Sequence, residues 1–330
     1  SGLSCGSGVH GDGDSLYMSL SGTSQATAVT GGIASLTREF LREQIGINSP
    51  SASLIKAAII NGATDIGSPD IPNNLEGWGQ IDLEKTVLPM DGSTVLSTYF
   101  DDKKSLRSGF GLLYELDLDP SHGLDITLVW TDEAGSANSA QSQSKLVNDL
   151  DLILVDPAGN QWLGNDFSSG FSKQGGTADN LNNVERIKIA PGTLSNTGNW
   201  LVKVMHRGGN EQDFSIVITG DMTIQPKSDL TTFNESIYLS SQNPLQNDIV
   251  SVRVAWMNQG TLDTQGFHWI LEDLTEGTIL MQGDSLGVDS SEVESVITTR
   301  SFSTTGIHTL RLSLDTDNVI SEMNDESSGI

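Results

Sequence analysis

A serine flanked by small residues is the part of this sequence best suited to chemistry. Ser24 lies in the run Leu20 to Ala28 (LSGTSQATA), directly before a stretch whose apolar residues recur three or four positions apart: Ile33, Leu36, Phe40 and Leu41. That spacing predicts a helix that packs one stripe against a core. Ser24 would then lie at the helix start, where free backbone N–H groups and the positive dipole end stabilise a developing oxyanion. The pattern is typical of a nucleophile, although Thr23 or Ser24 acting only as a helix cap would give the same local sequence.

Three ordered motifs resemble those of the subtilisin-like serine proteases (the subtilase family). Leu20 to Ala34 resembles the family's serine motif, Pro50 to Ala63 resembles the helix that follows it, and Gly77 to Asp82 (GWGQID) resembles its closing signature. Gln25 and Ala28 depart from the commonest pattern, in which the family has methionine and proline. The resemblance implies that residues 1–92 are the C-terminal part of an α/β catalytic domain, with Ser24 as the nucleophile.

The same resemblance implies an aspartate and a histidine that precede the serine in the chain. His10 is the one histidine before Ser24, and it lies in a glycine-rich run that does not match the family's histidine motif. We therefore expect a fragment of a secreted serine endopeptidase that acts on protein or peptide substrates and is inactive alone. The triad Asp and His and the oxyanion Asn would belong to a missing N-terminal half. The alternative is a non-catalytic surface or adhesion protein that retains a degenerate protease half.

The amino-acid composition limits which binding partners and which cellular location can be expected. The 330 residues include 43 acidic and 17 basic side chains, for a net charge of -26. This balance argues against nucleic acid as a partner and favours solubility, cation binding or life in salt. No apolar run is long enough to predict a membrane span. A single cysteine, Cys5, excludes an internal disulfide framework, so a secreted or cell-surface location, in a bacterium, is expected from the protease resemblance alone.

Helical periodicity gives way to short alternating strands after residue 92. Strands separated by Gly, Asn, Asp and Ser clusters predict a jelly-roll β-sandwich over residues 93–222. A second break precedes about seven strands over residues 223–330, which predict an immunoglobulin-like sandwich. The predicted fold is therefore multidomain: the C-terminal portion of an α/β subtilisin-like domain followed by two all-β domains.

Each β-rich segment also carries a resemblance of its own. Four stretches between Thr127 and Glu185 resemble the β-barrel domain that follows the catalytic domain in certain Bacillus alkaline serine proteases, similar in layout to the P-domain of proprotein convertases. The last segment resembles a bacterial cell-adhesion-related module through Val254 to Gly260 and Asp317 to Asp325.

Acidic and amide side chains in the middle segment predict a structural calcium site. Asp149 and Asp151 are two positions apart on a predicted strand, so they face the same side of the sheet. Calcium takes six to eight oxygen ligands from such groups, and the resembling proteases bind calcium in this domain. A solvated acidic face with Asx turns is the alternative. The predicted ligands are Asp149, Asp151, Asp166, Asp179, Asn182, Asn183 and Glu185.

Overall fold

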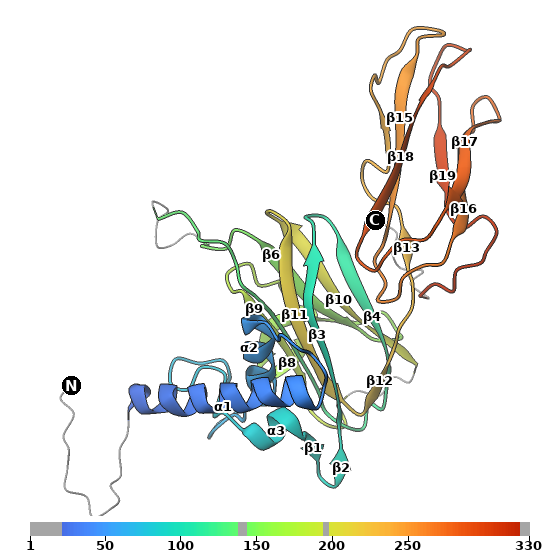
Figure 1. The fold of residues 1–330 in the computed structure, drawn as a ribbon. Helices are drawn as coiled ribbons and strands as arrows, with labels where there is room; N and C mark the ends of the chain where they lie inside the picture. Colours follow the sequence, from blue (N-terminus) through green and yellow to red (C-terminus); the bar gives the residue numbers. More distant parts are fainter. Residues whose placement is uncertain (1–21, 138–143, 194–197, 324–330) are drawn as a thin grey trace, which may run out of the picture.

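The computed structural model describes residues 22–137, 144–193 and 198–323. Its N-terminal part is helical and the rest consists of β-strands (Figure 1). The helices are α1 (Thr23–Glu43), α2 (Ala52–Asn61) and α3 (Leu83–Val87), followed by a short hairpin of β1 (Met90–Asp91) and β2 (Thr94–Val95). Cys5 and His10 lie outside the described residues.

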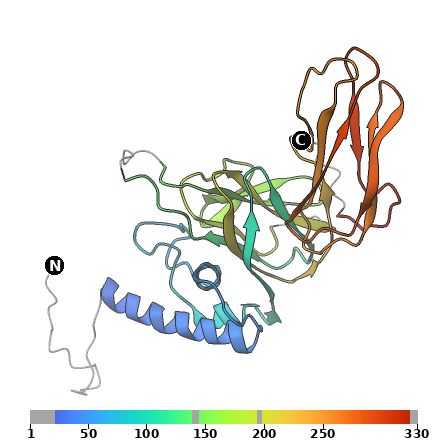
Figure 2. The ribbon, with the colours of Figure 1, turned by 45° about the horizontal axis from the view of Figure 1, so that its top comes forward.

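The α/β layer predicted for residues 1–92 is not seen in their described part. Residues 22–92 form three helices, and their strand pairing is limited to the β1–β2 hairpin and isolated bridges. Helix α2 instead lies between α1 and a sheet of the following segment (Figures 1 and 2). The apolar side chains of α2 are buried against that sheet, so its packing partner is supplied by the β-rich part of the chain.

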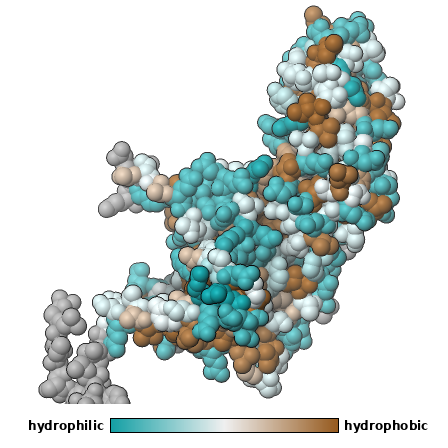
Figure 3. Space-filling model, in the orientation of Figure 1, coloured by the Kyte–Doolittle hydropathy of each residue, from teal (hydrophilic) through white to brown (hydrophobic). Residues whose placement is uncertain are grey.

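Helix α1 follows its sequence pattern only in its second half. Thr37 and Leu41 are buried and Phe40 is half-buried, whereas Leu36 of the predicted stripe is 49% exposed. Every residue from Gly22 to Gly32 is exposed. In Figure 3 apolar residues gather along the lower edge of the molecule, over α1, α3 and the hairpin. Exposed apolar residues of this segment include Val29 and Leu36 of α1, Leu88 after α3, and Met90 and Val95 of the hairpin.

Two antiparallel sheets face each other in the middle of the chain. One has the strand order β12-β4-β10-β6-β7-β8 and the other the order β3-β11-β5-β9. Trp130, Trp200 and Phe214 lie fully buried in the core between them. The strands are β3 (Ser97–Leu106), β4 (Gly111–Leu118), β5 (Leu124–Trp130), β6 (Asp149–Val155), β7 (Gln161–Ser168), β8 (Phe171–Gln174), β9 (Val184–Ile189), β10 (Asn199–Gly208), β11 (Gln212–Gly220) and β12 (Met222–Gln225).

A second, smaller sandwich follows and has a core of its own. In one sheet β15 pairs with β13, β14 and β18, and in the other β16 pairs with β17 and β19. Trp256 and Trp269 meet in its core with ring centroids 5.2 Å apart. The strands are β13 (Leu230–Thr231), β14 (Ile237–Leu239), β15 (Val250–Asn258), β16 (Phe267–Asp273), β17 (Thr278–Ser285), β18 (Val293–Arg300) and β19 (Leu310–Ser313).

The two sandwiches touch where β12 leads into β13. Phe110 packs edge-on against Phe233 with ring centroids 4.8 Å apart, and Leu113 N–H donates to the Gln259 carbonyl at 2.8 Å. Throughout the described parts of the chain, no helix combines the length and the apolar character that a membrane crossing requires.

Candidate functional site

Ser24 is the second residue of α1 and is exposed to solvent. The residue that caps this helix is Gly22, whose backbone φ is 150°, and no side chain makes the capping bond. The Gly22 carbonyl instead accepts from the N–H groups of Gln25 and Ala26, both at 3.1 Å. The capping interpretation of Thr23 or Ser24 is therefore wrong, and Ser24 stands in the first turn, at the positive end of a 21-residue helix dipole.

The four histidines among the described residues have partners in the β-rich part of the chain. His122 lies 3.0 Å from Asp91, His206 contacts the Asn210 carbonyl, His268 pairs with Asp284, and His308 pairs with Asp273. These four histidines of the described part of the chain therefore have partners other than Ser24.

Four of the predicted calcium ligands lie close enough to influence one another's charge. Burial raises the pKa of Glu185 well above its ordinary value, and the carboxylates of Asp151, Asp179 and Asp149 raise it further. Burial, followed by the charges of Asp151 and Asp179, also raises the pKa of Asp149. Strands β6 and β9 come from opposite sheets and, with the loop before β9, bring these residues together. Their mutual repulsion makes the cluster attractive to a cation.

Two oxygens in this cluster are buried without a hydrogen-bond donor. They are Asp149 Oδ1 and Glu185 Oε1. Glu185 is 1% exposed, and its other oxygen accepts from the Leu152 N–H at 2.6 Å. A buried carboxylate oxygen with no partner carries a desolvation penalty that a bound cation can relieve. The donor set is hard oxygen, which suits calcium.

Several of the predicted ligands, members of this cluster included, also have partners within the protein, although Asp166 Oδ2 is buried without a hydrogen-bond donor. Asp151 pairs with Arg207 at 2.6 Å and Asp166 with Lys173 at 2.9 Å. Asp179 accepts from the amide of Asn182 at 2.7 Å, and Asn183 donates to the Trp130 carbonyl at 2.9 Å.

One residue near the cluster was missed by the sequence interpretation. Asn165 donates to Asp179 at 2.6 Å, and its side-chain oxygen accepts from the backbone N–H of Arg186 at 2.9 Å. Its position next to Asp166 in an Asn-Asp pair was the one available signal.

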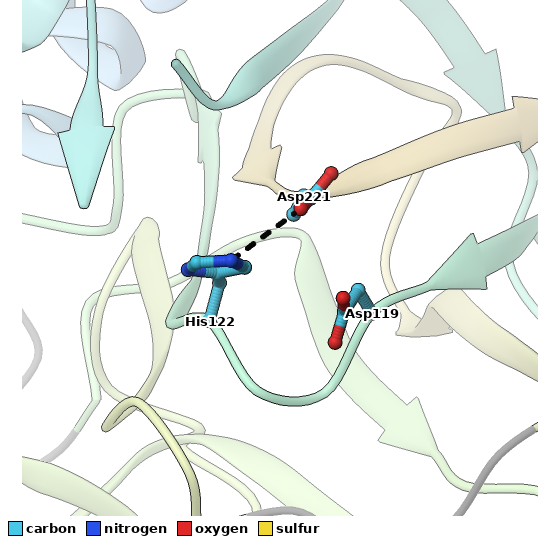
Figure 4. A group of neighbouring side chains, drawn as sticks. All are labelled: Asp119, His122 and Asp221. Carbon is cyan, nitrogen blue, oxygen red and sulfur yellow. Dashed lines mark ion pairs between the residues drawn. The ribbon is translucent and has the colours of Figure 1, made fainter. Parts of the chain in front are cut away.

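Three other groups bring potential metal-binding atoms within 4.8 Å of one another. They are Asp65, Asp70 and Glu76; Asp119, His122 and Asp221 (Figure 4); and Asp273, Glu276 and His308. The predicted calcium ligands, all of which lie in the described part of the chain, form no such group of three. In Figure 4 His122 points toward Asp221, at 3.6 Å. The members of each group lie on loops and strand ends. Two of the groups combine residues that are far apart in the sequence, so their spacing did not predict them: the group with Asp221 and the group with His308.

Comparison with known proteins gives a partial similarity to one protein named as a protease. No family model matches the chain. The serine protease/ABC transporter B family protein tagA of Dictyostelium discoideum is 33% identical over 243 residues, which cover 65% of this chain and 13% of that protein. The chain thus spans only 13% of the length of this relative.

Solved structures resemble the chain only weakly. The β-glucuronidase of Bacteroides uniformis aligns with 61% of this chain and 23% of its own at 12% identity and a TM-score of 0.23. A putative β-galactosidase of Bacteroides fragilis aligns with 65% and 32% at 12% identity and the same TM-score. No functional conclusion follows from similarity at this level. The chain is thus a mostly β protein with acidic groups that could hold a metal ion and a partial similarity to a protein named as a serine protease.

Proposed function

We propose that this chain is part of a subtilisin-like serine endopeptidase in which Ser24 is the nucleophile. The observation that carries the proposal is the exposed Ser24 in the first turn of the long helix α1, within the Gly-Thr-Ser sequence of the family motif. The partial similarity to a protein named as a serine protease supports it. A secreted or cell-surface location and protein substrates belong to the same proposal.

In the proposed mechanism Ser24 Oγ attacks the scissile carbonyl and gives its proton to a histidine. That histidine, and the aspartate that orients it, precede Ser24 in the family order and lie outside the described residues. In the same proposal the backbone N–H of Ser24 and an upstream asparagine hold the oxyanion, and the positive end of the α1 dipole favours the negative charge.

A fluorophosphonate probe on the longer protein that contains the upstream residues tests this proposal. Wild-type protein should be labelled on Ser24, and Ser24→Ala should lose labelling and lower peptide turnover by roughly three orders of magnitude or more. Ser35→Ala is the matched control, since Ser35 is another exposed serine of α1 whose hydroxyl donates to the Gly31 carbonyl. Full activity of Ser24→Ala, or labelling of a different serine, would contradict the proposal.

We also propose a structural calcium ion at the cluster of Asp149, Asp151, Asp179 and Glu185. The unpartnered buried oxygens of Asp149 and Glu185 support it. Calcium bound there would neutralise the cluster and join β6 to the loop before β9.

Thermal unfolding of the full chain tests the calcium proposal. Ligand at about 100 times its dissociation constant stabilises a protein by about 2.7 kcal/mol, a shift of several degrees. Calcium should raise the melting temperature above that in chelator at the same ionic strength, and Asp149→Asn should abolish the difference. Asp213→Asn, a matched change at the exposed position of β11, should keep the difference. Coincident curves for wild-type protein in calcium and in chelator would favour the solvated acidic face.

A further inference from the structure

Helix α2 has a charge from the middle sandwich at each of its ends. At the N-terminus, Asp102 of β3 accepts from the backbone N–H of Ser51, the cap residue, at 2.9 Å and from its hydroxyl. At the C-terminus, Arg186 of β9 donates to the Asn61 carbonyl at 3.0 Å and to Asp125 at 2.8 Å. An anion thus meets the positive end of the helix dipole and a cation meets the negative end.

The side of α2 that faces the sheet is bound by apolar contacts. Leu54, Ala57 and Ala58 form one buried cluster with Val129, Val184 and Val217, which project from the outer face of β5, β9 and β11. The charged groups at its two ends limit movement of α2 along its axis, and the apolar contacts hold its side against the sheet.

A buried polar network fixes the last turn of α2. Asn61 accepts from the Thr127 hydroxyl at 2.9 Å and donates to the Thr219 hydroxyl at 2.8 Å. Arg186, which binds the Asn61 carbonyl, is 0% exposed. Its Nη2 makes the hydrogen bonds to the Asn61 carbonyl and to Asp125, and because this side chain is buried these bonds orient α2 more strictly than an exposed ion pair would.

Helix α1 reaches the sandwich mainly through α2. Leu41 of α1 belongs to the same buried cluster as Leu54, and Arg38 donates to the Pro50 carbonyl at 3.3 Å, just before α2 begins. The half of α1 that carries Ser24 is exposed. Phe40 of α1 also packs edge-on against Phe100 of β3 with ring centroids 6.3 Å apart, so the position of α2 and this contact together set the orientation of α1 and of Ser24 relative to the sandwich.

We propose that the middle sandwich holds the α1–α2 helix pair in place through these two charges, so that Asp102 and Arg186 are positioning residues for the helix of the proposed nucleophile. The role for Ser24 rests on the proposed function. The seating of the helix pair does not rest on it and can be measured independently.

Amide hydrogen exchange of the full chain measures how firmly the α1–α2 pair is held against the middle sandwich. Asp102→Asn removes the charge and keeps the side-chain shape, so amides of α2 and of the second half of α1 should exchange about tenfold faster. Amides of β6 and β10 should stay as slow as in the wild type. Asp213→Asn is the matched control on the neighbouring strand β11. Equal exchange of α2 in these two variants would overturn the proposal.

The other end of α2 is tested with Arg186. Arg186→Met should loosen the last turn of α2, and Arg186→Lys should loosen it less, because lysine keeps the charge but lacks the planar guanidinium that fixes the direction of the two hydrogen bonds from Nη2. If the methionine variant does not fold, the lysine variant carries the measurement. If the amides of Ala58 to Asn61 exchange in Arg186→Lys at the same rate as in the wild type, the proposed role of the guanidinium is wrong.

Labelling of Ser24 in the longer protein distinguishes the positioning role of Asp102 from the catalytic role of Ser24 itself. Asp102→Asn should slow fluorophosphonate labelling and lower kcat several-fold with little change in KM, while Asp213→Asn should not. Wild-type labelling rates in a variant whose helices exchange faster would overturn the positioning role. A wild-type protein that is not labelled at all would instead contradict the proposed function, and hydrogen exchange would still decide the seating.

Discussion

Glu185 is the side chain whose burial has the clearest consequence for stability. Its ordinary pKa is 4.5, and burial followed by the charges of Asp151, Asp179 and Asp149 raises the pKa in the folded state. A carboxyl group with a raised folded pKa opposes folding when it is ionised. The penalty is therefore full above the folded pKa, shrinks as pH falls through it, and is absent below about 4.5.

Substitution of this residue should change stability in opposite directions with and without calcium. In chelator at neutral pH, Glu185→Gln should stabilise the chain by about 1 kcal/mol, because it removes a buried charge and keeps an oxygen for the Leu152 N–H. Calcium should stabilise the wild type and not the variant. Urea unfolding at pH 7 and pH 5 is the measurement, with the exposed Glu292→Gln as control. A variant less stable than wild type in chelator at pH 7 would refute this account.

At the residue scale, the sequence could predict which side chains share a face but not what surrounds them. Asp149 and Asp151 were placed together by the two-residue repeat of a strand, and both raise the pKa of Glu185. The absence of a hydrogen-bond donor at Glu185 Oε1 depends on how β6 and β9 of opposite sheets approach each other. The pairing of Asp151 with Arg207 depends on the register of β10 against β6. Neither is encoded in local spacing.

At the element scale, Gly62 at the end of α2 lies so close to α3 that a side chain at this position would push the two helices apart. A Cβ atom on Gly62 would lie 2.6 Å from Thr86 Oγ1 and 2.7 Å from the Thr86 backbone nitrogen. Gly62→Ala should therefore destabilise the helical segment by about 1–3 kcal/mol, since backbone cannot move aside as a flexible side chain can. The loss should appear in circular dichroism at 222 nm during thermal unfolding.

A matched glycine-to-alanine change inside α1 should have the opposite effect. A Cβ atom on Gly31 would meet nothing within 4 Å, and Gly31 lies in the helix interior. Gly31→Ala should stabilise α1 in this chain by about 0.5–1 kcal/mol through helix propensity. If both variants change the stability in the same direction, the close approach of α3 to α2 does not determine the effect of Gly62→Ala.

The sequence predicted most elements and left their packing partners open. The helix after Ser24 and the alternating strands around Trp130, Leu152, Ile187 and Val202 are present. An apolar stripe indicates that a helix face is buried, but it does not identify the surface that covers it. Here α2 packs on the outer face of the middle sandwich, a contact between residues more than 65 positions apart.

At the scale of the whole molecule, an ion pair between a buried glutamate and a half-buried lysine lies where the two sandwiches meet. Lys227 follows β12 and its ammonium lies 2.8 Å from Glu115 of β4, whose side chain is 2% exposed. Asn199 donates to the same carboxylate oxygen at 2.6 Å. Each sandwich has a separate apolar core. A change at this ion pair can therefore lower the stability of one sandwich and leave that of the other unchanged.

Removal of the lysine should therefore uncouple the unfolding of the two sandwiches. Lys227→Met leaves the buried Glu115 with the Asn199 amide as a donor in the described part of the chain, and breaking this half-buried pair should destabilise by about 2 kcal/mol. Differential scanning calorimetry should show the transition of the middle sandwich moving down while that of the last sandwich stays. The double variant Lys227→Met with Glu115→Gln removes the unpaired charge and should recover most of the loss. A double variant as unstable as the single one would mean that the lysine acts through its packing where the two sandwiches meet and not through its charge.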